Sequence, residues 1–161
     1  MVILNDPLIT LIQASYSAIW ASNTNAQHLP DLVRLTGVRV DTQQQQLILF
    51  VSLKFGETFL KNIHISKRVS FLCASVKTLE SYQLKGIYLS NRPCTPEESD
   101  YQKNYVDGFC RAVEQMGISS RKKFMDCFFQ QPGVAVCMQV EEIFEQTPKP
   151  GTGQKLSSVS V

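Results

Sequence analysis

Residues 47–53, "LILFVSL", form a nearly continuous apolar run, and this run constrains the fold more than any other stretch of the 161-residue chain. A run of this length and composition is typical of a β-strand that is buried on both faces. Such a strand needs a neighbour along each edge and cover over each face. The rest of the chain therefore has to wrap sheet or helix around it.

Five further stretches are predicted to be strands, and turn-like residues separate them. They are rich in β-branched or aromatic residues and cover 16–22, 29–41, 68–76, 82–90 and 133–146. The short spacer 77–81, "KTLES", favours an antiparallel hairpin between its two flanking strands. Because closure removes exposed sheet edges, we predict a mainly β barrel of about six antiparallel strands with three or four peripheral helices.

Helix signals stand at two places in the sequence. Asp6, as a capping side chain, and Pro7 predict the start of a short helix near the N-terminus. Thr95, Pro96 and Glu98 form a capping box with proline at the first helical position. Apolar residues then recur at helical spacing on one face until Gly117, namely Tyr101, Tyr105, Phe109, Val113 and Met116.

The chain is expected to form one domain followed by a tail. A domain over 1–147 would contain a helical insertion at about 95–128, in which a second, shorter helix is expected through 121–129. One or two turns of helix are also expected after Phe55. Residues 148–161 hold two prolines and two glycines and lack periodicity, so we expect a tail that either docks or stays mobile.

Composition excludes several classes of function. A net charge of +2 with 19% charged residues leaves no basic stripe for nucleic acid. No stretch approaches the ~20 apolar residues of a membrane span, and no secretory signal precedes the first strand. Five scattered cysteines without a C-x-x-C pair indicate free thiols in a reducing cytoplasm. His28 and His64 are too few and too isolated for a metal site.

The order of several short strings resembles the flavin-binding split-barrel superfamily, the group related to pyridoxamine 5′-phosphate oxidase. The strings are "LPDLVRLTGVRV", "LKNIHISKRVSFLCA", "SYQLKG" and "VEEIFEQTPKPGTGQKL", and they span most of the chain. The last two are similar to "LQLKG" and "QTPGPGAG" of an uncharacterised bacterial subgroup. The resemblance implies a split β-barrel, bound FMN, and a homodimer with the flavin at the subunit interface.

The resemblance also implies positions for the flavin phosphate. An Arg and, five residues on, a Lys of the second strand reach the phosphate in the oxidase, and Arg34 and Arg39 stand at these places. Two residues at this spacing fall on opposite faces of an ideal strand. Both arginines could therefore bind one phosphate only through a bend in the strand or the long reach of their side chains. The alternative is that both arginines simply face solvent.

A second phosphate position would lie where the third strand leads into a helix. The oxidase has a Gly-Ser-Arg-Lys run there, whereas this chain keeps the glycine as Gly56 and has Glu57, Thr58 and Phe59 in place of the other three. Thr58 and Lys61 are the candidate phosphate ligands at this helix start. A carboxylate disfavours a nearby dianion, and at a helix N-terminus Glu57 has a purely structural explanation.

The flavin ring is expected near the fifth strand. Gln83 stands where the family has a glutamine that contacts the ring, and Lys85 lies two residues on and therefore on the same face. An amide both donates and accepts hydrogen bonds, as the heteroatom edge of a flavin requires. The alternative for Gln83 is a polar residue on the open side of a hairpin. Trp20 and Tyr16 could flank a ring, although a lone Trp more often lies in the core.

Two functions remain open at this stage. One is an FMN-dependent oxidoreductase of unknown substrate or electron donor, in which the flavin performs the chemistry and no catalytic side chain is required. The tail lacks the Trp and Arg of the oxidase, which argues against pyridoxamine phosphate as substrate. The other is a non-enzymatic dimeric module that has lost flavin and binds a different ligand, such as haem or deazaflavin, or a protein partner.

Overall fold

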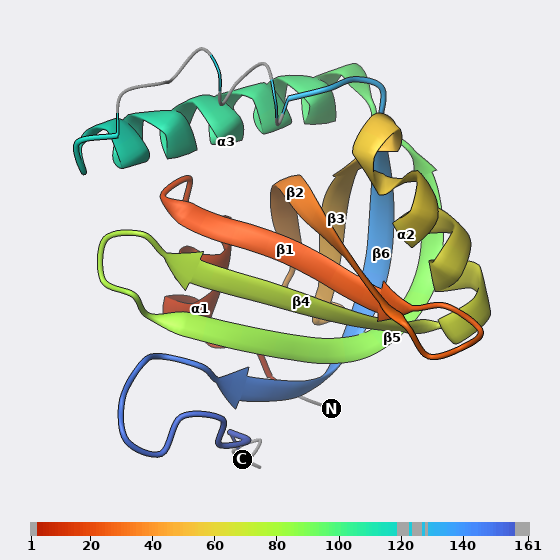
Figure 1. Ribbon diagram of the computed structural model, residues 1–161, viewed down its shortest axis with the longest axis horizontal. Coiled ribbons are helices and arrows are strands. Elements are labelled where there is room, and N and C mark those ends of the chain that lie inside the picture. Colours follow the sequence, from red (N-terminus) through yellow and green to blue (C-terminus); the bar gives the residue numbers. More distant parts are fainter. Residues whose placement is uncertain (1–2, 119–122, 124–126, 128, 157–161) are drawn as a thin grey trace.

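Six strands close into an antiparallel barrel in a computed structural model, which describes residues 3–118, 123, 127 and 129–156. The order around the barrel is β1-β2-β3-β6-β5-β4, and every neighbouring pair is antiparallel. The strands are β1 (Ser17–Thr24), β2 (Pro30–Asp41), β3 (Gln46–Ser52), β4 (Arg68–Ser75), β5 (Ser81–Pro93) and β6 (Gly133–Glu145). The predicted mainly β barrel of six strands is confirmed (Figure 1).

Residues 47–52 of the apolar run belong to β3, which is buried on both faces. Leu47, Leu49 and Val51 belong to the central core and are fully buried. Phe50 is also fully buried, and its ring meets the ring of Tyr101 edge to face at 5.8 Å between centroids. Alternate residues of one strand therefore fill the barrel interior and support a helix outside it.

Three helices surround the barrel within the described residues: α1 (Asp6–Gln13), α2 (Leu53–Ser66) and α3 (Pro96–Glu114). α1 and α2 add apolar side chains to the central core, and α3, which lies across the outside of β2, adds Tyr105 (Figure 1). Two tyrosine hydroxyls of α3 donate to strand carbonyls, Tyr101 to Val38 and Tyr105 to Ser17, both at 2.7 Å. None of the described helices is both long and apolar enough to cross a membrane.

Two helix predictions need correction or lie outside the described residues. Asn5, not Asp6, caps α1, because its side chain accepts from the Leu8 amide at 3.0 Å while Asp6 is the first helical residue. The shorter helix expected through 121–129 falls almost wholly outside the described residues.

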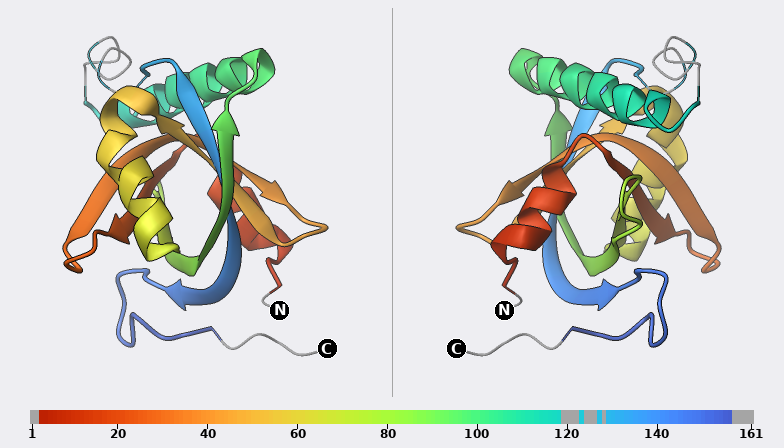
Figure 2. Two further views of the ribbon diagram at one scale, coloured as in Figure 1. Left: turned by 90° about the vertical axis from the view of Figure 1, so that its right-hand side faces the viewer. Right: turned by 90° about the vertical axis from the view of Figure 1, so that its left-hand side faces the viewer.

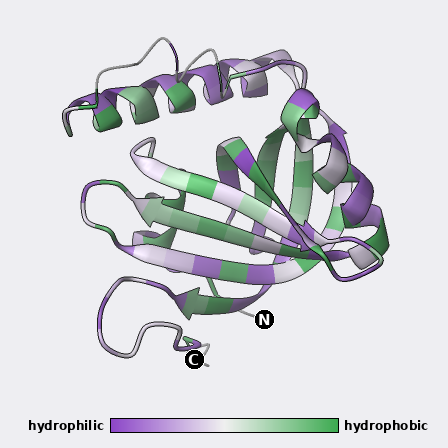
Figure 3. Ribbon diagram, viewed as in Figure 1, coloured by the Kyte–Doolittle hydropathy of each residue, from purple (hydrophilic) through white to green (hydrophobic). Residues whose placement is uncertain are grey.

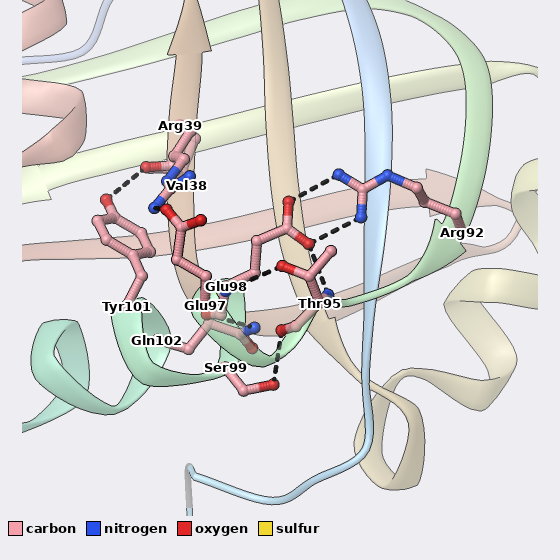
Figure 4. Close-up of polar contacts among 9 residues, drawn as sticks. All are labelled: Val38, Arg39, Arg92, Thr95, Glu97, Glu98, Ser99, Tyr101 and Gln102. Atoms are coloured by element: carbon pink, nitrogen blue, oxygen red, sulfur yellow. Dashed lines mark hydrogen bonds and ion pairs between the residues drawn. The ribbon is translucent and has the colours of Figure 1, made fainter.

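The N-terminus of α3 is fixed to the barrel by a polar network (Figure 4). The capping box is present as predicted, with Thr95 and Glu98 each accepting from the other's backbone amide. Glu98 is 5% exposed and holds the guanidinium of Arg92 through two hydrogen bonds of 2.7 Å. Fully buried Gln102 accepts from Thr36 at 2.7 Å, which ties the helix to β2. The network leaves these buried polar groups paired.

The segment after β6 folds back along that strand (Figure 2). Gly153 donates to the Glu145 carbonyl at 2.8 Å, and Leu156 donates to the Ile143 carbonyl at 2.9 Å. Gly151 and Gly153 have φ of 85° and 93°, a left-handed backbone that glycine adopts without strain. Backbone hydrogen bonds thus hold residues 148–156, the described part of the expected tail, against β6.

Replacing Glu98 with glutamine should destabilise the protein by about 1–3 kcal/mol, because Arg92 and the Thr95 amide lose a charged acceptor. The hydrogen bond from Arg92 holds the pKa of Glu98 below its usual 4.5. The carboxylate therefore contributes stability above about pH 4.5, and this contribution is lost as the pH falls through its lowered pKa. Urea unfolding of both proteins between pH 7 and pH 3 measures the difference.

The neighbouring Glu97 is the matched control, because it is 83% exposed and pairs with Arg39 at 3.3 Å. Glu97→Gln should change the unfolding free energy by less than about 1 kcal/mol. Equal losses in both variants, or a Glu98→Gln loss that persists unchanged at pH 3, would contradict the role given to Glu98.

Candidate functional site

A β-bulge in β2 places Arg34 and Arg39 on the same face of the sheet. The register with β3 shifts between Leu35 and Gly37, so the alternation of inward and outward residues reverses there. β2 therefore has the bend that Arg34 and Arg39 need in order to face the same side of the sheet. Both side chains now face α3 on the outside of the barrel.

The two arginines are nevertheless held at different points beneath α3. Arg34 is half-buried, with its guanidinium 5.0 Å from the ring centre of Trp20 and 4.4 Å from that of Phe109. Burial lowers the pKa of Arg34 from its ordinary value. Arg39 lies 4.7 Å over Tyr101 and pairs with Glu97. Phe109 and Tyr101 are two helical turns apart, about 12 Å along the axis, so the cations do not converge on one point.

The expected helix start at Thr58 is wrong, because α2 begins at Leu53 directly after β3. Thr58 and Lys61 therefore lie in the second and third turns, away from the amides that end the helix. The Leu53 amide donates to the Pro132 carbonyl at 3.0 Å. The sequence offers no proline or strong capping signal between β3 and α2, which explains the misplaced boundary.

The side chains at this segment have structural partners. Lys61 Nζ pairs with Glu57 Oε1 at 2.8 Å, and this hydrogen bond lowers the pKa of Glu57. Phe59 is fully buried in the core. A Cβ at Gly56 would lie 2.2 Å from a methyl carbon of Val51, so the glycine allows α2 to approach β3 closely.

Gln83 and Lys85 lie on the outer face of the sheet formed by β1, β4 and β5, and they belong to two adjacent cross-strand rows. Directly paired residues project to the same side. The first row, called the apolar row, runs across four strands through Trp20, Leu72, Gln83 and Phe144. The second, called the polar row, contains Ser22, Ser70, Lys85 and, on β6, Glu142. Figure 3 shows hydrophilic and hydrophobic residues alternating along β5.

A chain of hydrogen bonds runs from Gln146 through Gln83 of the apolar row to Ser70 of the polar row. Gln146 Nε2 lies 3.5 Å from Gln83 Oε1, and Gln83 Nε2 donates to Ser70 Oγ at 2.9 Å. Ser70 therefore accepts from Gln83, and its own hydroxyl proton remains available for another acceptor.

A pocket of about 190 Å³ opens beside the polar row, between β1, β4 and β5. Ser22, Ser70, Lys85 and Gly86 are among the residues that line it. Asn23 also lines it and is 6% exposed; its Nδ2 donates to the Phe59 carbonyl at 2.8 Å. Its Oδ1 is buried without a hydrogen-bond donor among the described residues. The pocket thus combines the hydroxyls of Ser22 and Ser70 with the cations of Arg68 and Lys85.

The charges around this pocket are mostly paired. Arg68 lies 2.7 Å from Glu141, and Lys155 lies 2.7 Å from Glu142. The Lys155 hydrogen bond lowers the pKa of Glu142. Lys85 makes no hydrogen bond or ion pair within the described residues, and its ammonium lies 4.5 Å over the ring of Phe144.

Sequence reasoning identified Gln83 and Lys85 but missed Ser22, Ser70 and Phe144. These three come from strands distant in sequence, and only the register of the barrel brings them beside Gln83 and Lys85. The period-2 alternation along each strand was the available signal, but it does not fix which residues face one another across strands.

Neither a reactive thiol at Cys73 nor a metal site is found among the described residues. Burial raises the pKa of the Cys73 thiol to about 12, so this cysteine is a core residue rather than a nucleophile. His, Cys, Asp and Glu side chains gather in no group able to hold a metal ion within the part of the chain that the structure describes.

A second bulge, between Lys85 and Gly86, shapes the pocket floor. A Cβ on Gly86 would lie 1.9 Å from the Gln139 carbonyl oxygen, so Gly86→Ala should destabilise the protein by about 2–3 kcal/mol. Chemical unfolding measures this loss. Ser90→Ala, at the exposed register shift of the same strand, should stay within about 0.5 kcal/mol. A Gly86→Ala variant as stable as Ser90→Ala would show that the close strand approach is absent.

Comparison with known proteins gives likeness in structure alone. Neither a protein-family model nor a curated protein matches the chain. HupZ of Group A Streptococcus is 13% identical with a TM-score of 0.56, and the match covers 94% of this chain and 99% of HupZ. A Clostridium acetobutylicum protein related to general stress protein 26, of the pyridoxinephosphate oxidase family, is 10% identical with a TM-score of 0.54 over 98% and 100% of the two chains.

An FMN-binding protein of Syntrophomonas wolfei is also similar, at 9% identity and a TM-score of 0.51 over 85% of this chain and 82% of that protein. At identities this low, the likeness shows the fold. The chain has the split-barrel fold of these proteins, and the resemblance that the sequence strings carry is confirmed at that level.

Proposed function

We propose that this protein binds FMN on the outer face of β1, β4 and β5 and acts as a flavin-dependent oxidoreductase. The observation that carries the proposal is the adjacency of the apolar and polar rows. A flavin is a planar, largely apolar ring with a polar edge and an anionic tail. A face with Trp20, Leu72 and Phe144 around the Gln83 amide, next to hydroxyls and Lys85, suits both parts.

Each of these residues has a defined task in this proposal. Gln83 binds the heteroatom edge of the ring, since its amide both donates and accepts. Trp20 flanks the ring and is itself held by Arg34, whose guanidinium lies over it. Lys85 supplies positive charge to the tail. Arg39, Thr58 and Lys61, the other candidates, lie outside the two rows.

The bound flavin would supply hydride or electron transfer, and the protein would supply binding, orientation and electrostatics. This chemistry requires no acid–base pair from the protein. The substrate or electron donor would be a small molecule that reaches the ring from the open side of the sheet.

A homodimer belongs to the same proposal. Leu72, Phe144 and, at the edge of α3, Trp20 are half-buried on this outer face, and Leu32, paired with Ser22 on β2, is 60% exposed. A second copy of the chain would bury this apolar surface and enclose the flavin between subunits.

The second candidate is a dimeric module that binds a different ligand, such as deazaflavin or haem, or a protein partner. The ion pair between Lys61 and Glu57 favours it, because a lysine neutralised in this way contributes little to binding a flavin phosphate. The burial of Phe59 where the oxidase has a cation adds to this case.

Flavin loading separates the two candidates. Purified protein should retain FMN through gel filtration and elute as a dimer. Gln83→Leu should weaken FMN binding about tenfold, the cost of about one hydrogen bond to the ring. Gln43→Leu, in the exposed turn after β2, should bind FMN like the wild type. Fluorescence quenching of the flavin measures both affinities.

Two results would count against the proposal in different ways. A wild type that cannot be loaded with FMN would favour the module without flavin. Equal FMN affinity in the wild type and Gln83→Leu would show that the flavin, if bound, lies elsewhere on the barrel.

A further inference from the structure

We infer that the pocket between β1, β4 and β5 binds the phosphate of the flavin through Ser22, Ser70 and Lys85, and that α2 does not bind it. This inference rests on the proposed flavin binding and assigns the anionic end of the ligand to a place that the sequence resemblance did not indicate. Three features of the pocket support it: Ser70 has a hydroxyl proton to donate, Lys85 has no ion pair among the described residues, and Ser22 and Ser70 lie opposite each other on paired strands.

The hydrogen-bond direction presents Ser70 as a donor. Gln83 Nε2 donates to Ser70 Oγ, so the hydroxyl proton of Ser70 must find an acceptor elsewhere. Ser70 lines the pocket, and Ser22 is its directly paired neighbour on β1. Two hydroxyls on paired positions lie about 5 Å apart, a distance that one phosphate group can bridge. An oxyanion in the pocket would therefore accept from both.

Lys85 supplies the charge that a phosphate requires. Arg68, Lys85 and Lys155 carry three positive charges around the pocket, against two negative charges on Glu141 and Glu142, which leaves one positive charge in excess. The two carboxylates pair with Arg68 and Lys155. Lys85 lines the pocket and has no ion pair within the described residues, so its flexible side chain can turn from Phe144 toward an anion.

The α2 segment is the competing position, and its geometry is less suited to a dianion. Lys61 is held by Glu57 at 2.8 Å, so a phosphate there would have to displace a carboxylate or lie beside it. The amides at the start of the helix lie at Leu53, more than a turn before Thr58. Arg39 is likewise paired with Glu97.

Comparing FMN with riboflavin, which lacks the phosphate, tests the inference directly. The ratio of the two affinities measures the contribution of the phosphate alone, and flavin fluorescence measures both in the same buffer. The wild type should prefer FMN. Lys85→Gln should reduce FMN affinity by ~10-fold or more with riboflavin affinity unchanged, as expected for loss of a charge-assisted hydrogen bond. Ser70→Ala should reduce the ratio in the same direction.

Lys61→Gln is the matched control, because it removes the same charge from the competing position. It should leave the ratio unchanged. A preference for FMN that survives Lys85→Gln, or that Lys61→Gln abolishes, would overturn the inference while leaving flavin binding itself intact.

A wild type that binds neither flavin would refute the proposed function, and inorganic phosphate then tests the pocket by itself. Phosphate-induced amide chemical shift changes at Ser22 and Ser70 that disappear in Lys85→Gln would support an anion site without flavin. No change at these amides in the wild type would overturn the inference.

Discussion

Burial of β3 on both faces is the constraint on which the rest of the structure depends. Its inward residues need a closed barrel, and its outward Phe50 needs α3. α3 packs mainly on β2, and Leu72, Gln83 and Phe144 on the outer face of β4, β5 and β6 remain partly exposed. Burial of Phe50 beneath α3 thus accounts for the side of the barrel that this helix covers.

The sequence predicted those features of the fold that depend on local patterns. Apolar runs located all six strands, and the capping box at Thr95 located the start of α3. The start of α2 was misplaced because Ser52 makes no capping hydrogen bond and no turn residue separates β3 from the helix. The bulge beside Gly37 was also missed as such, although the need for a bend was recognised, because a bulge depends on the partner strand.

In the candidate site, too, local sequence patterns predicted some residues, and strand register determined the others. Two-residue spacing placed Gln83 and Lys85 on one face, which needs no tertiary information. Ser22 and Ser70 joined them through strand register, which the sequence does not encode locally. Arg34 and Arg39 share a face, yet aromatic rings and Glu97 hold them apart. The structure thus gives Arg39 and Lys61 ion-pair partners, whereas Lys85, which lines the pocket together with Arg68, has no ion pair among the described residues.

Mapping FMN-induced changes in backbone amide chemical shifts tests the central claim most directly, because it locates the ligand without assuming any residue. Binding on the open sheet face predicts that the largest changes fall on β1, β4 and β5, around Ser22, Ser70, Gln83 and Gly86. Changes concentrated on α2 around Thr58 and Lys61, with the amides of β4 and β5 unaffected, would contradict the account.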